Sequence, residues 1–209
     1  MTKRERMKIK VCGMKYPENI RELSSLDIDF MGFIFYEKSS RYIDKYPGEM
    51  DFAGIKKTGV FVDSDYRYIK SKINEFKLDF IQLHGNESPA FCSEFKQEDA
   101  MVIKAFRVDN KFDFDICKDY LRMTDLFLFD AKGENPGGNG IVFNWKKMQE
   151  YKLEKQFLLS GGIGINHSKK LKDFYHPQCI GFDINSGFET APGVKNIELI
   201  KRFIDAIRS

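Results

Sequence analysis

A cysteine and an aspartate follow apolar runs of strand length, where their side chains could take part in acid–base chemistry. Cys12 ends residues 8–12 and precedes a glycine, and Asp130 ends residues 126–130. A thiol whose pKa is lowered by positive charge or helix N-termini can act as a general base. A carboxylate directly after four apolar residues is unfavourable to bury without a partner or a function. The residue types alone also fit a small buried cysteine and an aspartate that caps the next turn.

Two further apolar runs, over residues 156–164 and 179–187, end in glycine-rich turns that precede helical periodicity. Backbone N–H groups in such turns can converge on one point, and the N-terminal end of the next helix favours an anion there. Two adjacent turns of this kind are typical of the phosphate site after strands 7 and 8 of a (β/α)₈ barrel. The alternative is that the glycines only close tight turns.

Other polar residues at strand ends are weaker candidates for the same site. Arg41 lies in the loop after residues 30–35, where a guanidinium could hold a carboxylate through paired hydrogen bonds or simply be solvated. We expect His84 to pack and hydrogen-bond at its strand end, and Asp183 to support the phosphate turn. Trp145 is expected to pack on a helix, and the loop at residues 135–140 could close over the site as a lid.

Composition excludes several classes of protein. The chain has 209 residues, 42% hydrophobic and 31% charged, without an apolar run long enough for a membrane span or a secretory signal. We therefore expect a cytoplasmic protein with no membrane partner. Four scattered cysteines and three histidines show no metal-binding or disulfide spacing. A net charge of +3 predicts no nucleic-acid surface and is compatible with a small anionic substrate.

Apolar runs and amphipathic stretches alternate about every 25 residues, as repeated βα units around a parallel sheet require. We predict a single (β/α)₈ barrel over residues 1–209, with an open doubly wound sheet as the alternative. Beside the two C-terminal runs, strands are expected at residues 8–12, 30–35, 58–62, 80–83, 101–106 and 126–130. Helices are expected after Pro17, around residues 50–55, after Asp65, from Ser88, over residues 112–121, near Trp145 and after Asn196.

Motifs in a fixed order resemble those of the phosphoribosylanthranilate isomerase family, nearly from end to end. The residues that carry the resemblance are 10–13 (KVCG), 32–35 (GFIF), 39–42 (SSRY), 59–62 (GVFV), 82–85 (QLHG), 137–140 (GGNG), 143–145 (FNW), 160–162 (SGG), 183–187 (DINSG), Glu189 and 192–195 (PGVK). The chain departs from the family pattern at Ser40, Asn144, Asn185 and Phe188. Asn185 falls in the expected phosphate turn.

The resemblance implies a (β/α)₈ barrel that catalyses an Amadori rearrangement of N-(5-phosphoribosyl)anthranilate in tryptophan biosynthesis, without cofactor or metal. It implies that Asp130 is the general acid, that Cys12 is the general base and that Arg41 holds the anthranilate carboxylate. The substrate phosphate would be held by the backbone of four residues, namely Gly161, Gly162, Ser186 and Gly187.

Two other functions compete with this one. Indole-glycerol-phosphate synthase shares the phosphate end but would need a lysine acid and catalytic glutamates at strand ends, where this chain has Cys12 and Asp130. A binding protein that keeps the phosphate turns without turnover is the alternative from another class. The sequence is compatible with a monomer or a homodimer.

Overall fold

Eight parallel strands close into a barrel in the computed structural model, which describes residues 6–48, 52, 54–131 and 145–209. Because β1 pairs with both β2 and β8, the sheet has no free edge, and the predicted closed barrel is confirmed over the open sheet. The strands are β1 Lys8–Val11, β2 Phe30–Ile34, β3 Lys56–Phe61, β4 Phe80–Leu83, β5 Met101–Val108, β6 Leu126–Ala131, β7 Phe157–Ser160 and β8 Cys179–Ile184.

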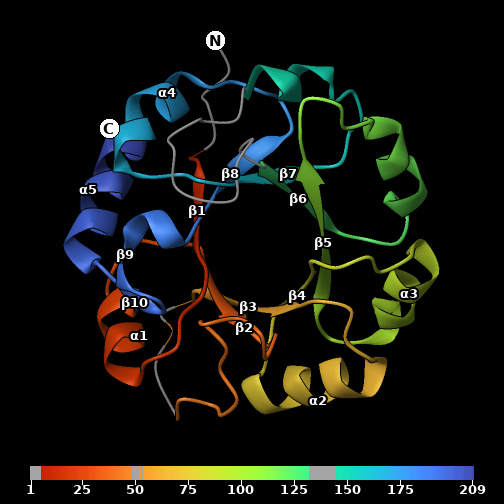
Figure 1. The fold of residues 1–209 in the computed structure, drawn as a ribbon, viewed down its shortest axis with the longest axis horizontal. Helices are drawn as coiled ribbons and strands as arrows, with labels where there is room; N and C mark the ends of the chain where they lie inside the picture. Colours follow the sequence, from red (N-terminus) through yellow and green to blue (C-terminus); the bar gives the residue numbers. More distant parts are fainter. Residues whose placement is uncertain (1–5, 49–51, 53, 132–144) are drawn as a thin grey trace.

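The connecting helices form a ring outside the barrel (Figure 1). The α-helices are α1 Pro17–Ser24, α2 Tyr66–Phe76, α3 Pro89–Ser93, α4 Ser168–Asp173 and α5 Ile197–Arg208. Short 3₁₀ helices complete the ring: η1 Glu94–Gln97, η2 Phe114–Tyr120, η3 Trp145–Glu150, η4 Ile165–His167 and η5 Ser186–Phe188. A hairpin of β9 Glu189–Ala191 and β10 Val194–Lys195 follows β8. These short connections let 209 residues close a fold that typically takes about 250.

The predicted helix starts are confirmed by the local hydrogen bonds. Pro17 occupies the first turn of α1, and the side chains of Asp65, Ser88 and Asn196 accept backbone N–H bonds at the starts of α2, α3 and α5. Each cap satisfies one of the donors that a helix start leaves without a partner. No helix of the described residues is long and apolar enough to cross a membrane.

Three expected helices differ from the structure, and one of them, the helix near Trp145, is the 3₁₀ helix η3. Of residues 50–55, only Phe52, Gly54 and Ile55 are described, and none of them is helical. The helix expected over residues 112–121 is the 3₁₀ helix η2, and Ile116, which we used to mark its apolar face, is 52% exposed. A 3₁₀ helix has three residues per turn, so the four-residue spacing of an α-helix does not keep side chains on one face.

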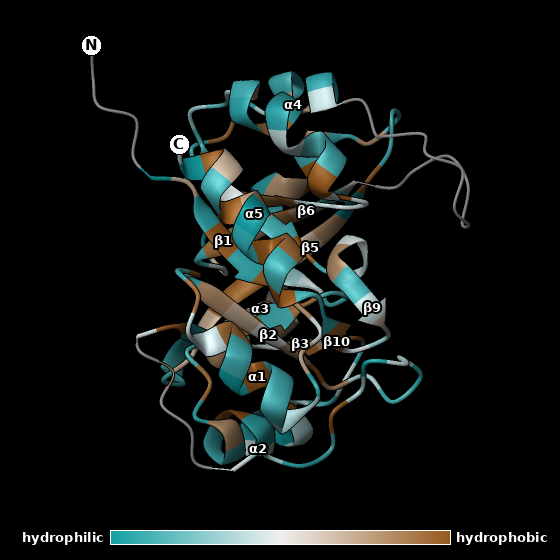
Figure 2. Ribbon diagram, turned by 90° about the vertical axis from the view of Figure 1, so that its left-hand side faces the viewer, coloured by the Kyte–Doolittle hydropathy of each residue, from teal (hydrophilic) through white to brown (hydrophobic). Residues whose placement is uncertain are grey.

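Alternate residues of each strand face the barrel interior or the helices, and this divides the apolar residues into two clusters. The inner cluster contains Phe30, Phe80, Ile103, Ala105, Leu126, Leu128 and Leu158. The outer cluster lies between strands and helices and includes Phe127 and Phe129. Figure 2 shows largely hydrophobic strands in the middle of the molecule and largely hydrophilic residues on the outer faces of the helices.

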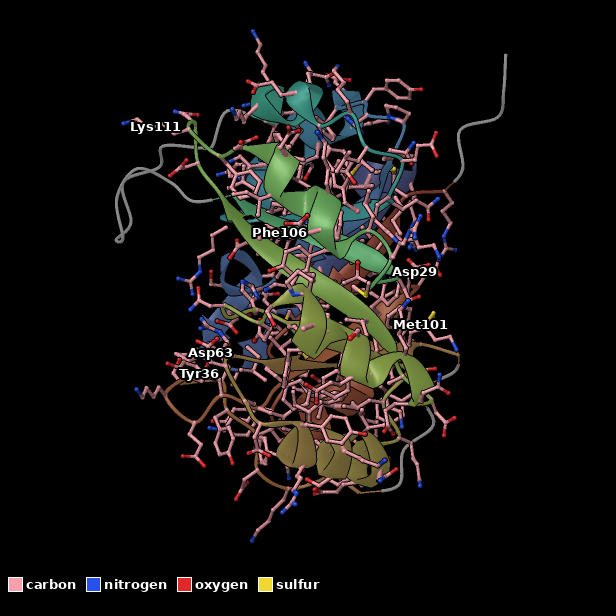
Figure 3. The ribbon with its side chains drawn as sticks, turned by 90° about the vertical axis from the view of Figure 1, so that its right-hand side faces the viewer. Asp29, Tyr36, Asp63, Met101, Phe106 and Lys111 are labelled. Atoms are coloured by element: carbon pink, nitrogen blue, oxygen red, sulfur yellow. The ribbon has the colours of Figure 1, made fainter. Side chains whose placement is uncertain are left out.

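Phe129 lies at the centre of an aromatic group between β6 and its neighbours. Its ring lies 5.0 to 6.1 Å, centre to centre, from five other rings, which belong to Phe106, Phe114, Phe127, Tyr151 and Phe157. Phe106 can be seen in Figure 3 against the ribbon of β5. Contacts of this kind add to the free energy of burial, so this group stabilises the side of the barrel that carries Asp130.

We predict that Phe129→Ala lowers the free energy of unfolding by about 3–5 kcal/mol, because the truncated ring leaves a cavity among rings that cannot close around it. Urea unfolding followed by circular dichroism measures the change. Ile116→Ala, at an exposed position, is the control and should change stability by less than about 0.5 kcal/mol. Equal effects of the two substitutions would contradict the assignment of Phe129 to the core.

Candidate active site

A cavity of about 220 Å³ lies at the carboxyl ends of the strands. Figure 3 shows the polarity of the barrel: Tyr36 and Asp63, which follow β2 and β3, lie on the same side as Lys111, whereas Asp29 and Met101 lie on the other. The described residues that line the cavity are Cys12, Ile34, Val60, Gln82, His84, Asp130, Ser160, Gly161, Gly162, Ile163, Asp183, Asn185 and Ser186. The structure thus brings six of the eight predicted site residues to one cavity.

The period of a strand explains why polar residues meet there. Leu126 and Leu128 belong to the inner cluster, so Asp130, two residues further along the same strand, also faces the interior. Leu158 of the inner cluster and Ser160 are related in the same way on β7. The barrel interior therefore has a lower layer of apolar side chains, toward the amino ends of the strands, and polar side chains where the strands end.

Cys12 follows β1 and is buried at 4% exposure against β2. A Cβ atom on Gly32 would lie 2.8 Å from Cys12 Sγ and 3.0 Å from its Cα, so only glycine leaves room for the thiol. Burial raises the pKa of the Cys12 thiol above its ordinary value, because it disfavours the thiolate; Lys10 and Lys195 oppose this rise. The pKa of this thiol therefore depends on the nearby charges.

A buried ion pair lies next to Cys12. Lys10 Nζ is 2.8 Å from Asp183 Oδ1, and the two side chains are 0% and 6% exposed. Ser160 Oγ donates to the other oxygen of Asp183 at 3.0 Å, so β1, β7 and β8 are connected through one carboxylate. Burial alone would lower the pKa of Lys10, but Asp183 and Cys12 outweigh it and raise that pKa. Lys10 therefore carries a positive charge inside the barrel.

Arg41 is held by a carboxylate of the β9–β10 hairpin. Its Nε and Nη2 atoms donate to both oxygens of Glu189 at 2.6 to 3.0 Å. Lys195 Nζ donates to the same carboxylate and, at 2.7 Å, to Asn185 Oδ1. Arg41 is not among the described residues that line the cavity, but a Cβ atom on Gly13 would lie 2.8 Å from both Arg41 Cδ and Asn185 Oδ1. The guanidinium is thus fixed beside the turn that follows Cys12.

Asp130 contacts a histidine at the end of β4. His84 Nε2 lies 3.2 Å from Asp130 Oδ2, and His84 Nδ1 lies 2.8 Å from Gln82 Nε2. An amide that donates to Nδ1 leaves the imidazole proton on Nε2, where it can donate to the carboxylate. The expectation that His84 hydrogen-bonds at its strand end is confirmed, and its partner is a predicted catalytic residue.

The two glycine-rich turns lie against each other. Gly161 and Gly162 have φ of 97° and 62°, which glycine adopts without strain. A Cβ atom on Gly162 would have no heavy atom within 4 Å, so the space above this backbone is open. Gly187 does not line the cavity; a Cβ atom there would lie 2.2 Å from Ile163 O, so this glycine allows the turn after β8 to approach the turn after β7.

Several residues of the site were not predicted from the sequence as site residues. Lys10 and Gln82 could have been found from strand alternation, because each lies two residues before a predicted site residue, Cys12 or His84. No local signal predicts the pairing of Lys195 with Glu189 and Arg41.

Two other expectations, for Trp145 and for the loop at residues 135–140, have different outcomes. Trp145 is 2% exposed and packs as predicted, whereas the proposed lid at residues 135–140 lies outside the described residues. The four cysteines are buried, and no group of three or more potential metal-binding side chains occurs among residues the structure describes.

A closed parallel barrel with an acid, a thiol and buried cations at the carboxyl ends of its strands defines a (β/α)₈-barrel enzyme. A family model described as N-(5'phosphoribosyl)anthranilate (PRA) isomerase matches residues 9–206. The chain belongs to this family of isomerases.

Relatives and solved structures agree with this assignment. The N-(5'-phosphoribosyl)anthranilate isomerase of Parabacteroides distasonis is 44% identical over 96% of this chain and 93% of its own length. That of Phocaeicola vulgatus is 41% identical over 97% and 98%. The crystal structure of phosphoribosyl anthranilate isomerase from Thermotoga maritima has a TM-score of 0.83 at 29% identity, covering 96% of this chain and 98% of that chain.

We predict that Gly32→Ala destabilises the protein by about 1–3 kcal/mol, because the new methyl group would meet the backbone and thiol of Cys12. The free energy of unfolding in urea is the measurement. Gly164→Ala is the matched control, because a Cβ atom there would meet nothing closer than 4.0 Å. A Gly32→Ala protein as stable as the Gly164→Ala protein would show that Cys12 is not confined by β2.

Proposed function

We propose that this chain converts N-(5-phosphoribosyl)anthranilate to 1-(2-carboxyphenylamino)-1-deoxyribulose 5-phosphate in tryptophan biosynthesis, with Asp130 as acid and Cys12 as base. The observation that carries the proposal is that both side chains line one cavity at the carboxyl ends of the strands. A structure related to this chain, with a TM-score of 0.79 at 28% identity, is a phosphoribosyl anthranilate isomerase in complex with reduced 1-(O-carboxyphenylamino)-1-deoxyribulose 5-phosphate.

Asp130 is proposed to protonate the ring oxygen of the ribose. The bond between that oxygen and the first sugar carbon then breaks, and the anthranilate nitrogen shares its electron pair to form an iminium ion. A protonated Asp130 needs an acceptor beside it. The Oε1 atom of Gln82 has no partner among the described residues. If the side-chain amide flips, Oε1 takes the place of Nε2 and accepts a hydrogen bond from His84 Nδ1. His84 Nε2 is then an acceptor and can hold the acid form of Asp130.

Cys12 is proposed to act as a thiolate in the second step. It removes the proton from the second sugar carbon, and the electrons of that C–H bond neutralise the iminium to give an enolamine. Protonation of the enolamine and loss of the hydroxyl proton yield the ketone, so no redox partner is required. Acid and base must be held in opposite protonation states at one pH, so each needs surroundings of its own. Cys12 is buried among charges, whereas the Asp130 side chain is 33% exposed.

The substrate phosphate is proposed to bind at the backbone of Gly161, Gly162, Ser186 and Gly187. The open space above Gly162 supports this position, and side chains in the first turn would fill it. Asp183 is proposed to support the phosphate turn indirectly, because it accepts from Ser160, the residue before Gly161. Phosphate binding at one end of the cavity would fix the sugar between acid and base.

Arg41 is proposed to hold the carboxylate of the anthranilate ring. Two cations, Arg41 and Lys195, share the single carboxylate of Glu189, so this group of three keeps a positive excess. A second carboxylate can therefore bind without displacing Glu189.

Partners and location are part of the same proposal. We propose a small phosphorylated substrate, no nucleic-acid partner and a cytoplasmic location. A related structure, with a TM-score of 0.78 at 27% identity, is of generated monomers of the dimeric isomerase from Thermotoga maritima, and a monomer or a homodimer is proposed for this chain.

We predict that Asp130→Asn and Cys12→Ala each lower kcat by about 10²–10⁴, the range for loss of a general acid or base. Turnover of freshly prepared phosphoribosylanthranilate is followed by the loss of its fluorescence. Asp115→Asn on the surface and Cys92→Ala in the outer core are the matched controls and should retain the wild-type rate. Near-normal turnover in either active-site variant would remove that residue from the mechanism, and tight product binding without wild-type turnover would indicate a binding protein.

Arg41→Met is expected mainly to raise KM for phosphoribosylanthranilate, because the lost guanidinium contacts the substrate carboxylate in ground and transition states alike. Steady-state kinetics compared with Arg21→Met, a substitution on the exposed side of α1, measure the effect. A KM equal to that of the control would count against the carboxylate contact.

A further inference from the structure

A lysine with no solvent exposure faces Cys12 from the same strand. Lys10 precedes Cys12 by two residues, so both side chains face the barrel interior. Lys10 also lies opposite Asp183 in the register between β1 and β8. Its ammonium group donates to the Asp183 carboxylate, and its positive charge lowers the pKa of the Cys12 thiol. A lysine fixed by a carboxylate thus lies on the same face of β1 as the thiol.

We propose that Lys10 is a positioning residue whose ammonium group holds the Cys12 thiolate for proton abstraction, while Asp183 and Ser160 keep that ammonium in place. The inference rests on the proposed function, because it assigns the origin of the base used there. The simpler alternative is that Lys10 only neutralises Asp183. The two alternatives differ in how the titration of the Cys12 thiol responds to substitution of Lys10 or Asp183.

Five charged groups face Cys12 or contact those that do. Lys10 comes from β1, Asp183 from β8, Lys195 from β10, Glu189 from β9 and Arg41 from the loop after β2. Three cations and two carboxylates leave one positive charge in excess while the thiol is protonated. Formation of the thiolate brings this sum to zero. With no ligand bound, the cluster can therefore balance one negative charge at Cys12.

Lys10 is the member of this cluster that can act directly on the sulfur. Lys195 is occupied by Glu189 and Asn185 and affects the thiol only through its charge. Arg41 is occupied by both oxygens of Glu189. Lys10 instead lies two residues before Cys12 on the same face of β1, is fully buried, and lowers the pKa of the thiol through its charge. Of the cations that surround Cys12, Lys10 is thus the one placed to orient the thiolate.

The sign of each effect follows from the charge removed. Burial raises the pKa of the Cys12 thiol, Lys10 lowers it and Asp183 raises it. Removal of the Lys10 charge should therefore move the titration of the thiol to higher pH, and removal of the Asp183 charge should move it to lower pH. Because the base acts when deprotonated, the acid limb of the kcat/KM profile should move in the same directions.

The experiment measures the rate of Cys12 alkylation by iodoacetamide against pH, with the modified cysteine located by mass spectrometry. The midpoint is the pH at which the alkylation rate reaches half of its maximum. Lys10→Met is expected to raise this midpoint by about one pH unit or more, and Asp183→Asn is expected to lower it. The double variant Lys10→Met with Asp183→Asn leaves no unpaired buried charge and should raise the midpoint less than Lys10→Met. If Lys10→Met alone does not fold, the double and Asp183→Asn variants decide the outcome.

A second buried ion pair provides the matched control. Lys104 and Glu87 are 3% and 2% exposed in their side chains and lie 2.9 Å apart, and Lys104 alternates with the inner-cluster residues of β5. Lys104→Met with Glu87→Gln should leave the midpoint of Cys12 unchanged. Midpoints in the Lys10 and Asp183 variants that equal this control would overturn the inference.

Steady-state kinetics separate this inference from the proposed function. Lys10→Met should lower kcat near neutral pH with little change in KM, and activity should recover as the pH rises. A purely structural role would lower activity at every pH. Alkylation requires no substrate, so shifted midpoints in a wild-type protein without turnover would support the role of Lys10 while contradicting the isomerase proposal.

Discussion

The register between β1 and β8 is the constraint on which the site depends. It closes the barrel and places Lys10 opposite Asp183, so that each buried charge meets its partner. A shift of one residue would turn Lys10 and Cys12 toward the apolar outer cluster and leave Asp183 without a cation. An unpaired buried charge strongly destabilises a fold, whereas a hydrogen-bonded pair is tolerated. Barrel closure and the arrangement of the thiol are therefore specified together.

The two layers of the interior divide stability from chemistry. The lower layer is filled by large apolar side chains such as Phe30, Phe80 and Leu126, which close the barrel to water from below. The upper layer holds Lys10 and Asp183 next to the cavity. Charges next to this apolar layer interact more strongly than charges in water, because the local dielectric constant is lower. A few fixed groups can therefore change the titration of one thiol substantially.

Strand alternation and glycine-rich turns were enough to predict most of the fold and the positions of Cys12 and Asp130. Such features are local, because they depend on neighbouring residues and on the period of each element. The ion pairs of the site are not local: 173 residues separate Lys10 from Asp183, and 148 separate Arg41 from Glu189. Their pairing depends on register and on the β9–β10 hairpin, neither of which has a signal in a single sequence. The misplaced Ile116 has another cause, since a 3₁₀ helix replaced an α-helix.

The proposed substrate carboxylate and the Cys12 thiolate are both anions, and each requires positive charge. The cations near the two anions lie in different places. Lys10 lies inside the barrel with Asp183, whereas Arg41 and Lys195 contact Glu189 at the hairpin. The inner pair is neutral until the thiolate forms, and the outer group keeps one positive charge for a ligand. Coulomb interactions weaken with distance and with solvent access, so this separation limits how far a bound carboxylate opposes the thiolate. A bound carboxylate would then add little to the rise that burial causes in the pKa of the Cys12 thiol.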